Sequence, residues 1–320
     1  YSRTFYHIIE AWQRAAALAS IALDYIKGKI MAKKILLLVF ILFGPFAAAW
    51  AGTSVWVVQS GGNVMYIGGT CHLLRQSDHP LPKAFTTAYQ ASDRLVFETQ
   101  LEQLQSAAFQ QKLVQKAMYA DGTTLDRVLS PAIYRELSDY CNRAGVPIAQ
   151  LRSFKPFMVI LTLVSVELEK MGVSSQAGVD HYFFTKARVD GKPTAGLETV
   201  QDQLDFLSSM SDGIEDRFVA KGLKDLDQFQ QLLDQLISVW RKGDEAKLYQ
   251  FFLRDMKNDF PKLHRRLVDD RNAAWLPQIK KMIASPQTEF VLVGVAHLVG
   301  PQGIVSLLKK QGLNVSKLEN

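Results

Sequence analysis

Two short segments near opposite ends of the chain repeat one pattern, in which an apolar strand runs into glycine, two small residues and histidine. The first spans residues 64–73 and the second spans residues 290–299. A buried strand that ends in this way places an imidazole at the carboxyl edge of a sheet, where open α/β sheets usually bind ligands. We therefore expect two such edges to bring His72 and His297 to one place.

The segment at residues 31–51 has the pattern of a secretory signal peptide. Met31 is followed by Lys33 and Lys34, then by an apolar run over 35–43 and by an Ala-x-Ala site that ends at Ala51. This pattern predicts cleavage after Ala51 and a periplasmic or secreted protein. The run is shorter than the ~20 apolar residues of a membrane helix, so no stable span is expected after cleavage, and an uncleaved anchor is the alternative.

Composition narrows the class of partner. The chain has 37 Lys and Arg residues against 31 Asp and Glu residues, and the excess lies mostly in residues 1–51, of which 1–30 precede the signal segment and form no domain. Nucleic-acid binding normally needs a clustered basic face, so we expect no nucleic-acid partner. The two cysteines, Cys71 and Cys141, form no disulfide scaffold and are expected to be unpaired and buried. The sequence leaves a homodimer open.

Residues 52–320 are predicted to form one α/β domain. Strands are expected at 54–59 and 63–70, joined by a turn, and a helix at 83–91 leads to a strand at 94–99, which suggests a parallel βαβ unit. Helices are expected over 101–177 and 201–284, and a short strand between them ends near Glu198. A strand at 289–295, a helix at 302–311 and a strand at 313–318 follow. The prediction is a central mixed sheet with both Gly-x-x-His motifs at strand ends, flanked by helices and a long helical middle region.

Four predicted strand ends offer groups that bind metals: His72, Glu98, Glu198 and His297. Imidazole and carboxylate groups suit a divalent ion such as Mn, Co or Zn, and the absence of a thiolate set argues against a closed structural zinc site. A carboxylate that is not a ligand could act as a general base. The sequence therefore predicts a candidate metal site at the carboxyl edge of the sheet.

Each of these residues also has an ordinary interpretation. A single Gly-x-x-His occurs by chance, and Glu98 and Glu198 could be N-caps of the helices that follow. Arg271 and Asn272 could form a surface pair, or Arg271 could hold a substrate carboxylate or orient Glu98. Asp180 is interpreted as a residue of a first helical turn.

Taken in order, the motifs resemble those of the TraB/GumN family, which is related to the Tiki-type metallopeptidases. The resemblance covers residues 54–318, and the motifs that carry it are Gly69-Thr70-Cys71-His72-Leu73, Val96-Phe97-Glu98, Gly178-Val179-Asp180, Gly196-Leu197-Glu198-Thr199 with Gln203, Asp270-Arg271-Asn272 with Trp275, and Val293 to Gly300 with Gly303. No single motif is specific, but the set in this order is.

The resemblance implies a function as well as a fold. By resemblance His72 and His297 are metal ligands with Glu98 as their acidic partner, and the activity is metal-dependent hydrolysis of a peptide or small-molecule substrate. Glu198 and Arg271 would support the catalytic site. The wider superfamily is similar to erythromycin esterases and to a haem-binding lipoprotein, so fold alone does not settle the reaction. The alternatives are an exported haem- or metal-binding protein without catalysis, and an interaction protein with a degenerate site.

Overall fold

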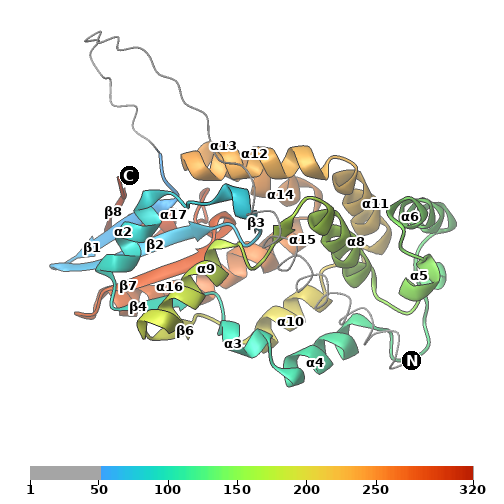
Figure 1. The fold of residues 1–320 in the computed structure, drawn as a ribbon, viewed down its shortest axis with the longest axis horizontal. Coiled ribbons are helices and arrows are strands. Elements are labelled where there is room, and N and C mark those ends of the chain that lie inside the picture. The colour runs from blue at the N-terminus through green and yellow to red at the C-terminus, as the bar shows by residue number, and fades with distance from the viewer. Residues whose placement is uncertain (1–51, 320) are drawn as a thin grey trace, which may run out of the picture. The chain divides into compact units, whose positions relative to one another are not determined.

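A six-stranded mixed sheet lies at the centre of the fold. The computed structural model describes residues 52–319, and the predicted signal peptide and the residues before it lie outside this range. The strand order is β6–β4–β7–β2–β1–β8, and a second sheet pairs β3 with β5 (Figure 1). The strands are β1 (Val55–Ser60), β2 (Asn63–Thr70), β3 (Leu74–Arg75), β4 (Arg94–Phe97), β5 (Val173–Ser174), β6 (Thr194–Gly196), β7 (Glu289–Gly294) and β8 (Asn314–Lys317).

Helices make up most of the remaining described chain. Two of the segments between them are π-helical turns, Gln250–Arg254 and Arg265–Asp269, and two are 3-10 turns, Gln76–Asp78 and Val295–His297. The α-helices are α2 (Lys83–Ala91), α3 (Leu101–Leu104), α4 (Ala107–Ala117), α5 (Leu125–Val128), α6 (Pro131–Ala144), α7 (Ile148–Leu151), α8 (Pro156–Lys170), α9 (Val179–Asp190), α10 (Val200–Ser208), α11 (Glu215–Leu226), α12 (Phe229–Lys242), α13 (Glu245–Tyr249), α14 (Asp255–Asp259), α15 (Pro261–His264), α16 (Asp270–Ile283) and α17 (Ile304–Lys310).

The predicted mixed α/β sheet is confirmed, with one difference in strand order. Strand β7 pairs in parallel with both β2 and β4, and β4 pairs in parallel with β6, whereas β1 is antiparallel to β2 and β8. The expected βαβ unit therefore does not make β2 and β4 neighbours, because β7 lies between them. All four parallel strands end at the same edge of the sheet.

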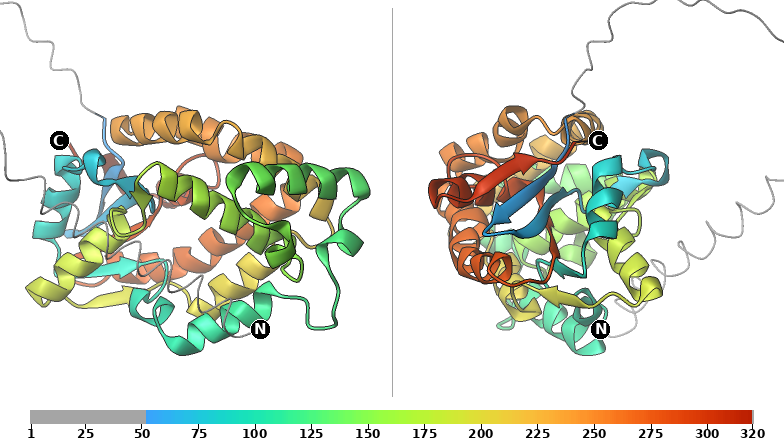
Figure 2. Two further views of the ribbon diagram at one scale, coloured as in Figure 1. Left: turned by 45° about the vertical axis from the view of Figure 1, so that its right-hand side comes forward. Right: turned by 90° about the vertical axis from the view of Figure 1, so that its left-hand side faces the viewer.

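Both faces of the central strand β7 are buried, which explains the unbroken apolar run in its sequence. Its side chains alternate between the two faces, and each face is covered by helices. Phe290 and Leu292 join the core beneath α2, α9 and α12, and Val291 and Val293 join the core beneath α16 and α17. The right-hand view of Figure 2 shows these two helical layers on opposite sides of the strands.

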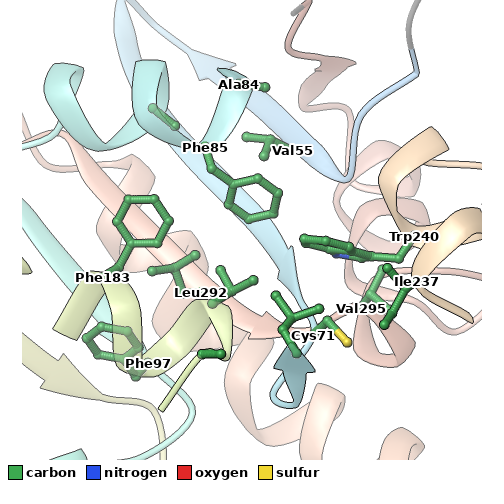
Figure 3. Packing of buried hydrophobic residues seen from close by; sticks show 14 of the residues in the cluster. Val55, Cys71, Ala84, Phe85, Phe97, Phe183, Ile237, Trp240, Leu292 and Val295 are labelled. Atoms are coloured by element: carbon green, nitrogen blue, oxygen red, sulfur yellow. The ribbon is translucent and has the colours of Figure 1, made fainter. Parts of the chain in front are cut away.

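Aromatic side chains fill the first of these cores (Figure 3). The ring of Phe85 on α2 lies between those of Phe183 and Trp240, at centroid distances of 6.2 and 5.7 Å. The indole nitrogen of Trp240 on α12 donates a hydrogen bond of 2.7 Å to the carbonyl of Gly69. This bond joins α12 to the end of β2, at the glycine of the first Gly-x-x-His motif.

Most predicted boundaries agree with the structure, and one feature was missed. The helix opened by Pro131 ends at Gly145, whose φ of 77° suits the left-handed conformation of a helix C-cap. The prediction of helices over 101–177 did not include β5, which pairs antiparallel with β3. Strands of two residues carry no periodic signal, because their pairing depends on segments remote in the chain.

Both cysteines are buried, and so are several side chains of the most apolar helix. Cys71 and Cys141 are free and buried, as predicted. Burial raises the pKa of the Cys71 thiol to about 12, so the reactive thiolate is scarce beside the first motif. Helix α8 packs into the core through Phe157, Ile160 and Leu163. Within residues 52–319, no helix combines the length and the apolar character needed to cross a bilayer.

Candidate functional site

The four parallel strands deliver the predicted residues to one edge of the sheet. His72 follows β2, Glu98 follows β4, Glu198 follows β6 and His297 follows β7. Atom Nε2 of His72 lies 3.6 Å from Oε1 of Glu98, and Nε2 of His297 lies 4.0 Å from the same oxygen. Two imidazoles far apart in the chain thus point at one carboxylate oxygen.

A carboxylate on α9 holds the first imidazole. His72 Nδ1 donates to Oδ2 of Asp180 at 2.7 Å, and the Thr70 hydroxyl donates to the other oxygen of Asp180 at 3.1 Å. The Asp180 charge raises the pKa of His72 to about 9, although burial acts against this shift and Glu98 adds to it. In the ion-free protein at neutral pH, His72 is therefore protonated, and its side chain is 54% exposed.

An amide on α16 holds the second imidazole. Oδ1 of Asn272 accepts a 2.8 Å hydrogen bond from His297 Nδ1, which places the ring proton on that nitrogen. The Asn272 amide nitrogen donates to the carbonyls of His297 and Gln302, so this fully buried side chain has no unused group. Burial and the nearby Arg271 charge lower the pKa of His297 to about 3, which leaves Nε2 as an unprotonated acceptor.

Glu98 is held as an anion between its neighbours. Its Oε1 accepts a 2.7 Å hydrogen bond from the backbone N–H of Gly294, and its Oε2 accepts one of 2.7 Å from Nη2 of Arg271. Burial opposes ionisation of Glu98, but His297, which is protonated in the acidic range where Glu98 titrates, acts together with His72 and Arg271 to lower the pKa to about 2. A carboxylate with so low a pKa is a weak proton acceptor.

Arg271 on α16 connects the two glutamates. Its Nε and Nη2 donate to the two oxygens of Glu198 at 3.0 and 2.7 Å, in a bidentate pair, and its Nη1 lies 3.0 Å from Nε2 of His297. The Trp275 indole donates to Glu198 at 3.1 Å, and its ring lies 4.6 Å from the guanidinium carbon. Burial disfavours the charged guanidinium, but Glu98 and Glu198 outweigh this effect and raise the pKa of Arg271.

The chemical nature of these donor groups suits a divalent ion better than the distances between them do. Two imidazole nitrogens and one carboxylate oxygen form a common donor set, and hydrogen bonds on both Nδ1 atoms are typical of histidine ligands. Two ligands at ~2.1 Å from one tetrahedral ion lie about 3.4 Å apart, slightly closer than the two Nε2–Oε1 distances. Arg271 also occupies the free nitrogen of His297. Among residues 52–319, no group of three or more His, Cys, Asp or Glu side chains is already spaced to hold an ion.

The structure does not support the alternative that Glu98 and Glu198 are helix N-caps. The N-cap of α3 is Gln100 and that of α10 is Thr199, so neither Glu98 nor Glu198 caps a helix. Asp180 does lie in the first turn of α9, but its hydrogen bond to His72 gives it a place in the site that the sequence interpretation missed. Asn272 was missed as a partner of His297 in the same way.

Comparison with known proteins identifies the family of this chain. The model of the TraB/PrgY/gumN family matches residues 54–317, nearly the whole described chain. The chain belongs to the TraB/PrgY/gumN family. Its two Gly-x-x-His segments and the three acidic residues of the site all lie within the matched range.

Two curated members of this family are similar along most of their length. The "Uncharacterized protein YbaP" of Escherichia coli strain K12 is 21% identical over 264 residues, which cover 79% of this chain and 90% of the relative. The protein of the same description from Shigella flexneri matches with the same identity and coverage. No solved structure matches the chain significantly.

Proposed function

We propose that this TraB/PrgY/gumN family member is a metal-dependent hydrolase, and that its substrates are peptides. One observation carries the proposal: Nε2 of His72 and Nε2 of His297 converge on Oε1 of Glu98, at 3.6 and 4.0 Å. Each imidazole is oriented through its other nitrogen, by Asp180 or by Asn272. Structural histidines have no need to converge in this way on one anion.

In this proposal His72, His297 and Glu98 are the ligands. A bound Mn, Co or Zn ion would act as a Lewis acid towards the scissile carbonyl and the attacking water. The low pKa of Glu98 favours a role as ligand over a role as general base. Three carboxylates (Glu98, Glu198 and Asp180) outnumber the cationic groups Arg271 and His72, and this excess of negative charge favours a cation.

Glu198 and Arg271 have supporting roles. Glu198 accepts both prongs of the Arg271 fork, which fixes the guanidinium against Glu98. While no ion is bound, Nη1 of Arg271 donates a hydrogen bond to Nε2 of His297. Arg271 must therefore release His297 before that nitrogen can act as a ligand.

Metal analysis of the purified full chain tests the ligand set. Wild type is expected to hold one divalent ion per chain, and His72→Ala and His297→Ala are each expected to lose it. His181→Ala is the matched control. His181 lies beside the site, and among the described residues no hydrogen bond or ion pair joins it to Glu98. Equal metal content in all four proteins would contradict the proposal.

Hydrolysis is tested separately from binding. A peptide library incubated with metal-loaded protein and read by mass spectrometry is expected to show cleavage that Glu98→Gln abolishes. Metal binding without cleavage would favour the alternative of a binding protein, and a Soret band on haem titration that His72→Ala abolishes would identify that ligand as haem.

The proposed location is outside the cytoplasm. It depends on the signal pattern at residues 31–51, which lies outside the described residues. The mass of the protein recovered from the cell envelope is expected to correspond to a chain that begins at Gly52. A chain that retains residues 31–51 in the membrane fraction would instead indicate an uncleaved anchor.

A further inference from the structure

A cavity of about 390 Å³ opens directly beside the candidate metal site. Three residues of the site, His72, Glu98 and Asp180, form part of its wall. The rest of the wall comes mainly from β4, α3 and α9, and includes Phe97, Leu101, Leu104 and Phe184. We call this cavity the Leu104 pocket. Whatever binds at the site has this space next to it.

Four apolar side chains give the Leu104 pocket a fixed wall. The rings of Phe97 and Phe184 meet edge to face, with centroids 6.2 Å apart and an interplanar angle of 78°. Both rings are buried in the core, so their positions do not depend on a ligand (Figure 3 shows Phe97). Leu101 and Leu104 stand three residues apart on α3 and therefore face the same side. Both leucines are only partly buried, which leaves apolar surface for a ligand to cover.

The charges of the wall exclude one class of ligand. None of the residues that line the Leu104 pocket is a lysine or an arginine. Nδ1 of His72 is already paired with Asp180 at 2.7 Å, and the Arg271 guanidinium is bound to Glu98 and Glu198. In the metal-free protein, an anionic group in the pocket would lie near Glu98 and Asp180, and no described residue of the wall supplies a lysine or arginine to pair with it, which is costly in a partly buried site.

We propose that the Leu104 pocket is the subsite for a neutral, apolar side chain of the substrate, such as that of leucine or phenylalanine. In the metal-free protein, the negative charges of Glu98 and Asp180 disfavour acidic side chains there. The word substrate rests on the proposed function, but the preference for a neutral apolar group depends only on the wall of the pocket. The two ideas can therefore fail independently.

Small amides that differ in one side chain test this preference. The probes are N-acetyl-leucinamide, N-acetyl-glutaminamide and the α-amide of N-acetyl-glutamate, titrated into metal-free full chain whose leucine methyl groups carry ¹³C. The leucine probe is expected to shift the methyl signals of Leu101 and Leu104 and to bind about tenfold more tightly than the glutamine probe. The glutamate probe is expected to bind most weakly of the three.

Variants of α3 locate the effect. Leu104→Asp is expected to weaken binding of N-acetyl-leucinamide at least tenfold, because it places a charge in the apolar wall. Leu104→Trp, which stays apolar but fills the space, is expected to weaken it as well and covers the case in which the aspartate variant does not fold. Leu161→Asp is the control, since Leu161 is exposed on α8 and does not line the pocket.

Equal binding of the three probes, or binding that neither Leu104 variant changes, would overturn the subsite. If the probes behave as stated while the protein binds no ion, the subsite stands and the proposed hydrolysis fails. If ions bind and peptides are cut with no preference at this position, the hydrolysis stands and the subsite fails.

Discussion

Gly294 faces the imidazole of His72 so closely that a Cβ on this glycine would lie 2.9 Å from Nε2. The same Cβ would lie 3.2 Å from Oε1 of Glu98. The glycine of the first motif has a matching position, because a Cβ on Gly69 would lie 2.7 Å from a methyl carbon of Val295. Each Gly-x-x-His glycine thus makes room for the other motif.

Gly294→Ala is expected to weaken binding of a divalent ion at least tenfold, because the new methyl group pushes His72 and Glu98 out of position. Isothermal titration with Mn or Zn measures the change. Gly69→Ala is the matched control: its methyl group overpacks the apolar contact with Val295, and we expect it to cost about 1–3 kcal/mol of stability while changing ion affinity much less. Equal loss of affinity in both variants would show that a general disturbance of the sheet edge is responsible.

Asp180→Asn is expected to lower the pKa of His72 from about 9 towards its ordinary value, since the Asp180 charge is the main cause of the shift. The NMR signal of the His72 ring in metal-free protein, followed against pH, measures this. A raised histidine pKa stabilises the folded state below the unfolded value of about 6.5, and this stabilisation is lost as the pH rises through about 9. The stability advantage of wild type over Asp180→Asn should therefore shrink between these pH values. It will be small, because the His72 side chain is half exposed. A titration unchanged by the substitution would contradict the role given to Asp180.

Much of the fold could be predicted from the sequence, because a buried strand or helix carries a local pattern of apolar residues. The apolar run of β7 and the glycine at its end predicted both a buried strand and its limit. The position of β7 between β2 and β4 was not predictable in this way. That order depends on which strand edges pair in space, and no residue near β7 in the sequence reports it.

The candidate site, like the fold, could be predicted only in part from the sequence. His72, Glu98, Glu198 and His297 were predicted because each directly follows a recognisable strand. Asp180 was missed as a partner because it lies at the start of a helix far along the chain from His72, and an acidic residue in a first helical turn has an ordinary explanation. Only the hydrogen bond between the two side chains identifies it.

Asn272→Leu is expected to destabilise the protein by about 2–4 kcal/mol, measured by urea unfolding. The substitution keeps the number and branching of the side-chain heavy atoms but leaves the His297 ring N–H and two backbone carbonyls without their partner in a fully buried place. Asn314→Ala is the control, because its amide bonds only to the exposed side chain of Gln59, and we expect a change below about 0.5 kcal/mol. Similar losses in both variants would mean that the Asn272 network contributes no more than a surface contact.

Arg271→Ala is expected to lower stability and to raise ion affinity together. Its removal leaves Glu198 without a cation and leaves Glu98 with only His72 as a positive neighbour, which costs about 3–5 kcal/mol in urea unfolding of the metal-free protein. The same change frees Nε2 of His297 and removes a positive charge from beside the donor set, so Mn or Zn should bind at least tenfold more tightly. Adding Glu198→Gln to this variant should recover part of the lost stability, because one unpaired charge disappears. Arg152→Ala, which breaks only an exposed pair with Asp126, should alter neither quantity. Weaker ion binding in Arg271→Ala would instead show that the guanidinium is needed to hold the ligands in place.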